Sequence, residues 1–355
     1  MPHGNMTTWK DHIEGLKNEI NASLEEFLTE KVNQSRDSLV REISSMIREY
    51  SLRGGKRVRP LLVLLGHDLF KPHDRAVVRA SLSIEISQSY FIIQDDIMDQ
   101  SPFRRGFPSF HIEVQNKYFS GDPSKKRISE NLGIIASDLA DSYSHEAIIS
   151  SGLPPEIALK GEKELCNIFE VTGHGQLIDV FSAENDSFSE PDLIKLHLWK
   201  TARYTIEGPL MLGAAISGTS EKLNDLSHFG NLLGVAFQLH DDILGIFGDE
   251  KKTGKSIKSD INEGKKTMLV LKAIEFGSDE QADFIRRSIR SGSVTDAEFD
   301  RVKKIMVDTG SLDYSRKLAD RFVERAKKYL GRVRGNEEIK SVIGEFSDYL
   351  ISRDS

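Results

Sequence analysis

Two short acidic segments, each set in a run of apolar residues, constrain this chain more than any other feature. Residues 91–98 read FIIQDDIM, and residues 237–244 read FQLHDDIL. An ionised carboxylate is costly to bury unless a partner or a metal ion offsets its lost hydration. Residues four apart share one face of a helix, so Asp95 and Asp99 can point the same way. Two such helices facing each other would form an oxygen-rich pocket suited to Mg²⁺ and to a diphosphate.

The rest of the chain shows helical periodicity from end to end. Apolar residues recur at helical spacing in residues 13–28 and 39–50. Pro60, Pro155 and Pro191 are typical of first helical turns. The sequence contains no alternating run bounded by a hairpin dipeptide, and no Pro/Gly/Ser linker divides it. We therefore predict an all-α fold with one domain over residues 1–355, a single large helical bundle around a central catalytic cavity.

Composition excludes several classes of protein. The net charge is −7, and the basic residues are dispersed, which argues against a nucleic-acid partner. The most apolar run, residues 61–65, is too short for a membrane span. The single cysteine, Cys166, excludes an internal disulfide and fits a reducing compartment. The N-terminus has no basic segment followed by an apolar core, so we expect a cytoplasmic protein.

Basic residues cluster at glycine-containing turns beside both acidic segments. The sequence GGKRVRP at residues 54–60 places three cations at a predicted helix start, where free backbone N–H groups favour an anion. Arg104 and Arg105 follow the first acidic segment, and lysines at TGK (253–255) and GKKT (264–267) follow the second. Each cluster alone could be an ordinary exposed turn. Beside metal-binding carboxylates, they indicate phosphate binding.

The motifs GGKRxRP, DDxxD, RRG, GQxxD, KT, FQxxDD and GKxxxxDxxxGKKT occur in this order between residues 54 and 267. Together they resemble the trans-prenyltransferase family, the (E)-isoprenyl diphosphate synthases that make farnesyl and geranylgeranyl diphosphate. The resemblance implies the isoprenoid synthase fold and a Mg²⁺-dependent transferase of isoprenoid biosynthesis. Its substrates would be isopentenyl diphosphate and an allylic diphosphate (dimethylallyl, geranyl or farnesyl). It also implies a homodimer.

The resemblance assigns roles to individual residues. Metal ligands for three Mg²⁺ ions, with Mn²⁺ as a substitute, would be Asp95, Asp99 and Asp241. The allylic diphosphate and its ionisation site would be held by Arg104, Lys200, Lys255, Thr201 and Gln238, with Lys265 as a further substrate-binding residue. Isopentenyl diphosphate would be held by Lys56, Arg59, Gln88 and Arg105. Catalysis would rest on Asp95, Asp99, Arg104, Lys200, Asp241 and Lys255, with Gln176 and Asp179 orienting other groups.

Three positions depart from the family's pattern. Gln88 and Gln94 stand where members usually carry His, although Gln88 can still donate a hydrogen bond to isopentenyl diphosphate. Gly245 stands where the second acidic motif commonly ends in Asp. Asp241 is the ligand that matters most in the family, and many geranylgeranyl-type members share this form, so we expect activity. The effect of Gly245→Asp should be mild, because position 245 is not the essential one in the motif.

Product length would depend on side chains one or two helical turns before Asp95. Tyr90 and Phe91 occupy the fifth and fourth positions before it, and Ser87 the eighth. In the family these positions form the floor of the elongation tunnel, so two adjacent aromatic rings indicate a shallow tunnel. The DDxxD motif carries no two-residue insertion. The resemblance therefore favours a C20 product, with C15 or a C15/C20 mixture as the alternative.

Three other functions compete with this interpretation. A metal-dependent phosphohydrolase would use the His-Asp pairs at residues 67–68 and 240–241, but it needs further ligand histidines. A terpene cyclase also uses DDxxD on a helical fold, but has no need of a second diphosphate site. A non-catalytic subunit of a prenyltransferase would typically lose acidic or basic residues that this chain keeps.

Overall fold

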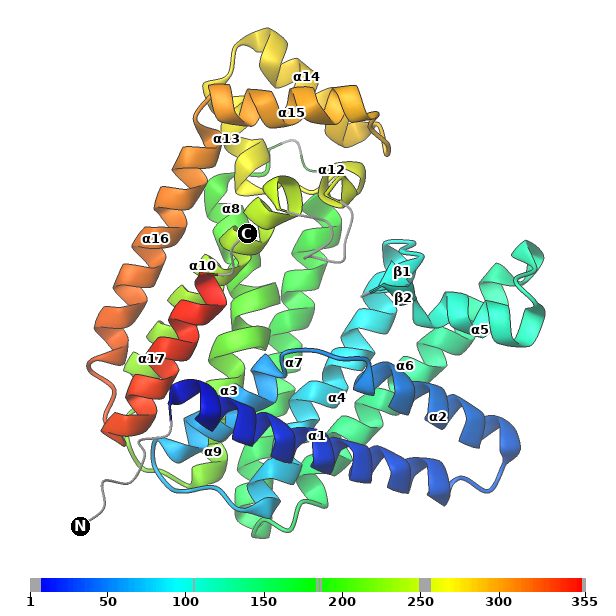
Figure 1. Cartoon of the computed structure of the whole chain (residues 1–355), viewed down its shortest axis with the longest axis vertical. Coiled ribbons are helices and arrows are strands. Elements are labelled where there is room, and N and C mark those ends of the chain that lie inside the picture. The colour runs from blue at the N-terminus through cyan, green and yellow to red at the C-terminus, as the bar shows by residue number, and fades with distance from the viewer. Residues whose placement is uncertain (1–7, 105, 183–184, 186, 249–256, 353–355) are drawn as a thin grey trace. The chain divides into compact units, whose positions relative to one another are not determined.

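The computed structural model describes residues 8–104, 106–182, 185, 187–248 and 257–352. Helices make up nearly all of the regular secondary structure in these residues, which confirms the all-α prediction (Figure 1). The exception is a short antiparallel hairpin, β1 (Phe103–Arg104) with β2 (Phe107–Pro108). The backbone divides into two compact units, which are described separately. The single domain over residues 1–355 stays a prediction.

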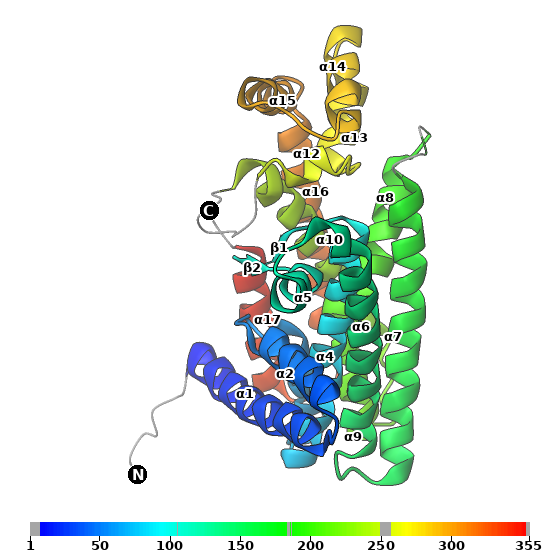
Figure 2. The same ribbon diagram turned by 90° about the vertical axis from the view of Figure 1, so that its right-hand side faces the viewer.

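The first unit comprises residues 1–166, 209–221 and 334–343. Its helices are α1 (Trp9–Gln34), α2 (Ser38–Leu52), α3 (Val58–Asp68), α4 (Arg75–Met98), α5 (Phe110–Phe119), the short η1 (Pro123–Lys125), α6 (Lys126–Ile149), the start of α7 (Pro155–Ser182) and α9 (Gly208–Ser217). Helix α4 is the centre of this unit and packs along α6 (Figure 2). In α4, Ile84, Ile86 and Ile93 are fully buried, and so are the small polar residues Ser83 and Ser87. Neighbouring helices therefore cover α4 on several sides.

Helices α3 and α9 contact each other at backbone distance. The apolar run at residues 61–65 lies in α3 and is fully buried, so it is core and not a membrane segment. A Cβ at Gly66 would collide with the carbonyl of Leu210, and one at Gly213 would collide with the carbonyl of Val63. These two glycines therefore permit the close packing of α3 against α9. That packing fixes the position of α3 and of the basic turn before it.

The second unit comprises residues 167–208, 222–333 and 344–355. Its helices are the rest of α7, α8 (Glu190–Leu196), η2 (His197–Glu207), α10 (Asn224–Phe247), α12 (Ser259–Asn262), α13 (Met268–Phe276), α14 (Asp279–Arg290), α15 (Asp296–Asp308), α16 (Ser311–Leu330) and the end of α17 (Glu337–Ile351). Helix α10 packs against η2 and α16. Thr295 and Glu298 form a reciprocal capping box at the start of α15, as their spacing predicts.

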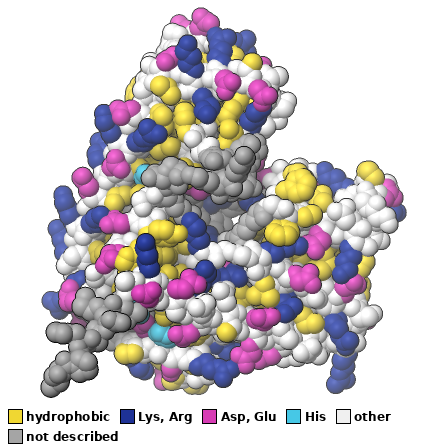
Figure 3. Space-filling model, viewed as in Figure 1, with side chains coloured by type: hydrophobic (Ala, Val, Ile, Leu, Met, Phe, Trp, Pro, Cys, Tyr) yellow, Lys and Arg dark blue, Asp and Glu magenta, His cyan; other side chains and the backbone are white. Residues whose placement is uncertain are grey.

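The visible surface is charged, and the length and hydropathy of the helices decide whether they could cross a membrane. On the face shown in Figure 3, acidic and basic side chains are interspersed. Within the described ranges, every helix is too short or too polar to cross a bilayer.

Candidate functional site

The first acidic segment ends α4, and the carboxylates of Asp95, Asp96 and the C-cap residue Asp99 differ in exposure. Asp95 is partly buried and Asp99 is exposed, whereas Asp96 is fully buried. Asp96 accepts hydrogen bonds from the Tyr50 hydroxyl at 3.1 Å and from Arg104 Nε at 2.8 Å. Burial raises the pKa of Asp96, while the bonds from Arg104 and Tyr50 act in the opposite direction. The inner carboxylate is therefore a structural anchor, and the outer two are accessible from solvent.

Arg104 is held against this acidic turn by the β-hairpin. Its Nη2 lies 3.7 Å from Asp95 Oδ2 and also contacts Asp96. The hairpin exposes Phe103 and Phe107, which contribute to the apolar patch over β1 and β2 in Figure 3. A charge-assisted pair places the guanidinium beside the predicted metal ligands. Arg105, the predicted ligand of isopentenyl diphosphate, lies outside the described residues.

A small pocket opens beside Asp96. Its lining comes from α2, α4 and the segments next to them, and consists of Tyr50, Ser51, Arg53, Glu85, Gln88, Ser89, Ile92 and Arg104. Two predicted site residues, Gln88 and Arg104, thus share one cavity. Sequence reasoning missed Tyr50 and Arg53. The position of Arg53, directly before Gly54-Gly55, is the signal that could have extended the basic cluster to it.

The basic turn before α3 uses its cations in different ways. Gly54 has φ 57° and Gly55 φ 136°, values that favour glycine, and the chain turns sharply there. Arg57 is buried and donates to Glu85 Oε1 at 2.5 Å and to the Ser51 carbonyl at 3.0 Å. Lys56 is exposed, and Arg59 is partly buried. Arg57 therefore holds the turn in place, and the anion-binding prediction concerns its two neighbours.

The second acidic segment, on α10, shows the same division between an outer and an inner carboxylate. Asp241 is exposed and Asp242 is buried. Thr201 Oγ1 donates to Gln238 Oε1 at 2.9 Å, and Gln238 Nε2 donates to Asp242 Oδ1 at 2.8 Å. Burial, then the charges of Asp260 and Asp241, raise the pKa of Asp242 well above its usual range.

A π-helix, η2, positions two further predicted residues in the second unit. Lys200 and Thr201 both lie on it. Such helices are rare and frequently mark functional sites. A Cβ at Gly175 would collide with the backbone of Lys200, and one at Gly234 with Ala202, so these glycines let α7 and α10 approach η2 closely. Lys200 Nζ donates to Asp179 Oδ2 at 2.5 Å, which fixes the lysine.

The segment after α10 explains the glycine at position 245. A Cβ there would collide with Oδ2 of Asp260, so the Asp260 carboxylate occupies the space next to Gly245. Lys265 Nζ lies 3.4 Å from Asp260 Oδ1 and 2.5 Å from Glu263 Oε2. Lys265 thus contacts acidic groups of its own segment. Lys255 lies outside the described residues.

The three predicted chain-length residues sit differently on α4. Ser87 is fully buried, and its hydroxyl donates to the Ile84 carbonyl at 3.0 Å. Tyr90 and Phe91 are partly buried, with ring centroids 4.8 Å apart. Burial, followed by the charges of two aspartates on α6, raises the pKa of Tyr90. Tyr90 therefore lies on the side of α4 that faces α6.

Comparisons with known proteins agree with this geometry. The sequence pattern of the family described as "Polyprenyl synthetase" matches residues 40–306. A geranylgeranyl pyrophosphate synthase from Geoglobus acetivorans is 31% identical over 336 residues, covering 94% of this chain and 96% of that protein. A geranylfarnesyl diphosphate synthase from Aeropyrum pernix is 31% identical over 309 residues, covering 84% and 91%.

Solved structures give the same result. The crystal structure of a Corynebacterium glutamicum geranylgeranyl pyrophosphate synthase, complexed with isoprenyl diphosphate and magnesium, matches with a TM-score of 0.88. It is 28% identical and covers 94% of this chain and 99% of its own. The crystal structure of a geranylgeranyl pyrophosphate synthetase from Pyrococcus horikoshii matches with a TM-score of 0.80 at 26% identity, covering 96% and 99%.

Proposed function

Since this chain belongs to the polyprenyl synthetase family and is a prenyltransferase, a polyprenyl diphosphate synthase, we propose that it condenses isopentenyl diphosphate with allylic diphosphates to give geranylgeranyl diphosphate. The resemblance drawn from the motifs is thereby confirmed at the level of the family. One observation supports the residue assignments best. In each acidic segment the second aspartate is buried and hydrogen-bonded, while the first is accessible from solvent.

We propose that Asp95, Asp99 and Asp241 hold Mg²⁺ ions on the allylic diphosphate. Accessible carboxylates at the ends of helices fit a hard cation that binds oxygen and keeps several waters. Bound there, the ions would act as Lewis acids that stabilise the charge of the departing diphosphate. The inner carboxylates hold neighbouring groups in position. Asp96 accepts a hydrogen bond from Arg104 and so fixes its guanidinium. The hydrogen bonds from Thr201 to Gln238 and from Gln238 to Asp242 fix α10 against η2.

The cationic residues then serve two diphosphates. Arg104, Lys200 and Lys255 would bind the allylic diphosphate, whose C–O bond breaks with the electron pair leaving on oxygen. Preorganised positive charge stabilises that developing negative charge without reorganisation. The alkene of isopentenyl diphosphate attacks the allylic cation, and the released diphosphate takes the proton that is lost. Lys56, Arg59, Gln88 and Arg105 would hold isopentenyl diphosphate.

The product is proposed to be C20, with C15 or a mixture as the alternative. The adjacent rings of Tyr90 and Phe91, both partly buried on α4, support a shallow tunnel. Because one relative is named a geranylfarnesyl diphosphate synthase, the product assay should also resolve chains up to C25.

The test is incubation of the purified chain with isopentenyl diphosphate, each allylic primer in turn, and Mg²⁺, with products sized by chromatography. Asp95→Asn and Asp241→Asn are each expected to lower turnover about 10²–10³-fold, the usual effect of removing one charge-stabilising group. Asp308→Asn is the matched control, because Asp308 is an exposed aspartate at the last position of α15. Normal turnover in Asp95→Asn, or no product with any primer, would overturn the proposal.

A metal-dependent phosphohydrolase is the alternative function suggested by the His-Asp pair at residues 67–68. His67 and Asp68 are both buried, and Asp68 accepts hydrogen bonds from the ring and the backbone N–H of His73. These contacts give the pair a structural role. Phosphate release from a simple ester in the absence of isopentenyl diphosphate would favour this rival.

We also propose that the chain forms a homodimer. In the first unit, α6 exposes Ile128, Ile135 and Ile149, and α7 exposes Leu159. Apolar side chains exposed together on neighbouring helices are a common mark of an interface. Sedimentation should give a dimer at micromolar concentration, and Ile135→Arg should weaken it. A monomeric wild type under these conditions would contradict the proposal.

A further inference from the structure

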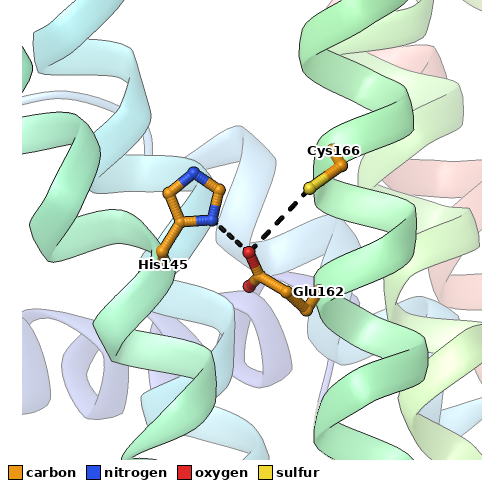
Figure 4. Close-up of side chains that lie close together, drawn as sticks. All are labelled: His145, Glu162 and Cys166. Atoms are coloured by element: carbon orange, nitrogen blue, oxygen red, sulfur yellow. Dashed lines mark hydrogen bonds and ion pairs between the residues drawn. The ribbon is translucent and has the colours of Figure 1, made fainter.

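Three side chains of types that bind metals lie close together between α6 and α7 (Figure 4). His145 comes from α6, and Glu162 and Cys166 come from α7. One ligand atom from each lies within 4.8 Å of the other two. Glu162 and Cys166 are four residues apart and so share one face of α7. One oxygen of Glu162 contacts His145 Nδ1 and lies 3.9 Å from the sulfur of Cys166.

The surroundings of this group are acidic, and two buried carboxylate oxygens there have no hydrogen-bond donor among the described residues. Asp141, one turn before His145 on α6, places Oδ1 3.7 Å from His145 Nε2. That oxygen and Oε2 of Glu162 are both buried and make no hydrogen bond within the described part of the chain. Burial raises the pKa of Asp141, the charge of His145 opposes this, and the charges of Asp138 and Glu162 raise the pKa further. A buried carboxylate oxygen without a donor is costly, and a bound cation would remove that cost.

We infer that His145, Glu162 and Cys166 form a binding site for a divalent cation of the zinc class. Thiolate, imidazole and carboxylate are the donors that Zn²⁺ takes, whereas Mg²⁺ prefers oxygen alone. Bond lengths of about 2.0–2.3 Å require ligand atoms roughly 3.3–3.7 Å apart. To admit the ion, Glu162 and His145, which now contact each other, would move apart, and Cys166 would move closer by about 1 Å at most. A water molecule would fill the fourth position.

Asp141 acts in this site as a positioning residue. With Nδ1 of His145 on the ion, Nε2 would carry the proton, and Asp141 Oδ1 lies 3.7 Å from Nε2. Ligating histidines usually donate their second N–H in this way, which fixes the tautomer and the ring orientation. The ion would tie α6 to α7.

The experiment titrates the metal-stripped, reduced full-length protein with Co²⁺ as a spectroscopic probe for Zn²⁺. Cysteine thiolate bound to Co²⁺ gives a charge-transfer absorption, and Cys166 is the only cysteine in the chain, so the band reports on this site alone. The band is expected to correspond to one Co²⁺ per chain at this site and to disappear when one Zn²⁺ displaces it. Carboxylates of the acidic segments can bind the probe but give no such band.

Variants then identify the ligands. Cys166→Ser should abolish the band, and His145→Gln and Glu162→Gln should each weaken Co²⁺ binding more than tenfold. Asp141→Asn should weaken it about 10–100-fold while keeping the band. Glu156→Gln, an exposed carboxylate in the first turn of α7, is the matched control and should change nothing. Prenyl transfer by each variant checks that it is folded.

Three results would overturn the inference. One is the absence of a thiolate band in the wild type, which needs no variant to interpret. The second is a band that persists at full affinity without His145 or Glu162, because Cys166 would then bind the probe alone. The third is one ion per two chains, which would mean a site formed between molecules.

Discussion

Replacing Phe91 by alanine is expected to lengthen the product. Phe91 lies one helical turn before Asp95 on α4, with its ring 4.8 Å from that of Tyr90 and tilted by 57°. If these rings close the tunnel, removing one creates space for a further isoprene unit. Such a unit adds about five carbons, and each buried methylene contributes about 0.8 kcal/mol, so its burial is worth about 4 kcal/mol. That corresponds to roughly a thousandfold shift toward continued elongation.

The stability cost of the same change should be moderate. Truncating a fully buried phenylalanine costs about 3–5 kcal/mol. The ring of Phe91 is only partly buried, so we expect about half of that loss and a decrease in Tm of about 2–4 °C. A matched control is Phe119→Ala on α5, where Tyr118 and Phe119 form another adjacent, partly buried pair with centroids 6.4 Å apart.

The assay combines chromatographic sizing of products with a thermal melt. Phe91→Ala should give products longer than those of the wild type, whereas Phe119→Ala should lower Tm without changing product length. Tyr90→Ala combined with Phe91→Ala should extend the product further. A Phe91→Ala protein that is folded, loses only a few degrees in Tm and makes the wild-type product would refute the reasoning.

Three further changes have defined outcomes. Lys56→Ala should raise KM for isopentenyl diphosphate more than KM for the primer, since an exposed charge on a non-ionising diphosphate contributes ground-state binding; equal changes would contradict separate sites. Gly245→Asp should lower turnover, and it should also lower Tm measured without Mg²⁺, because a Cβ at position 245 collides with the Asp260 carboxylate. An unchanged Tm would contradict this and would support the mild effect expected from the sequence. The hydrogen bond to Asp68 raises the pKa of His73, so this stabilisation is complete below about pH 6.5 and disappears as pH rises through the raised value. The Tm advantage of wild type over His73→Gln should therefore shrink from pH 6 to 9, and parallel curves would contradict it.

Several features of this protein followed from the sequence because they depend on residues close together in the chain. The capping box of α15 needs only Thr295 and Glu298, and it is present. Pro155 is the first residue of α7, as its fixed φ favours. The ordered motifs between residues 54 and 267 identified the family, which the comparisons confirm. These features depend on residues at fixed, short spacing, so the packing of the rest of the chain does not change them.

Burial, by contrast, is set by residues distant in the sequence. Nothing in FIIQDDIM distinguishes Asp95 from Asp96, yet only Asp96 is covered, by Tyr50 and by Arg104 of the hairpin. In the same way, Arg57 became a buried structural residue through Glu85 on another helix.

Tertiary packing also decided which groups meet. Asp260 fills the space beside Gly245, and His145 meets Glu162 and Cys166 only because α6 and α7 lie together. The sequence by itself determined the family and the residue types that carry its chemistry. Only the tertiary structure decided which carboxylate faces solvent and which is an anchor, because the free energy of a charge depends on the neighbours that replace its water.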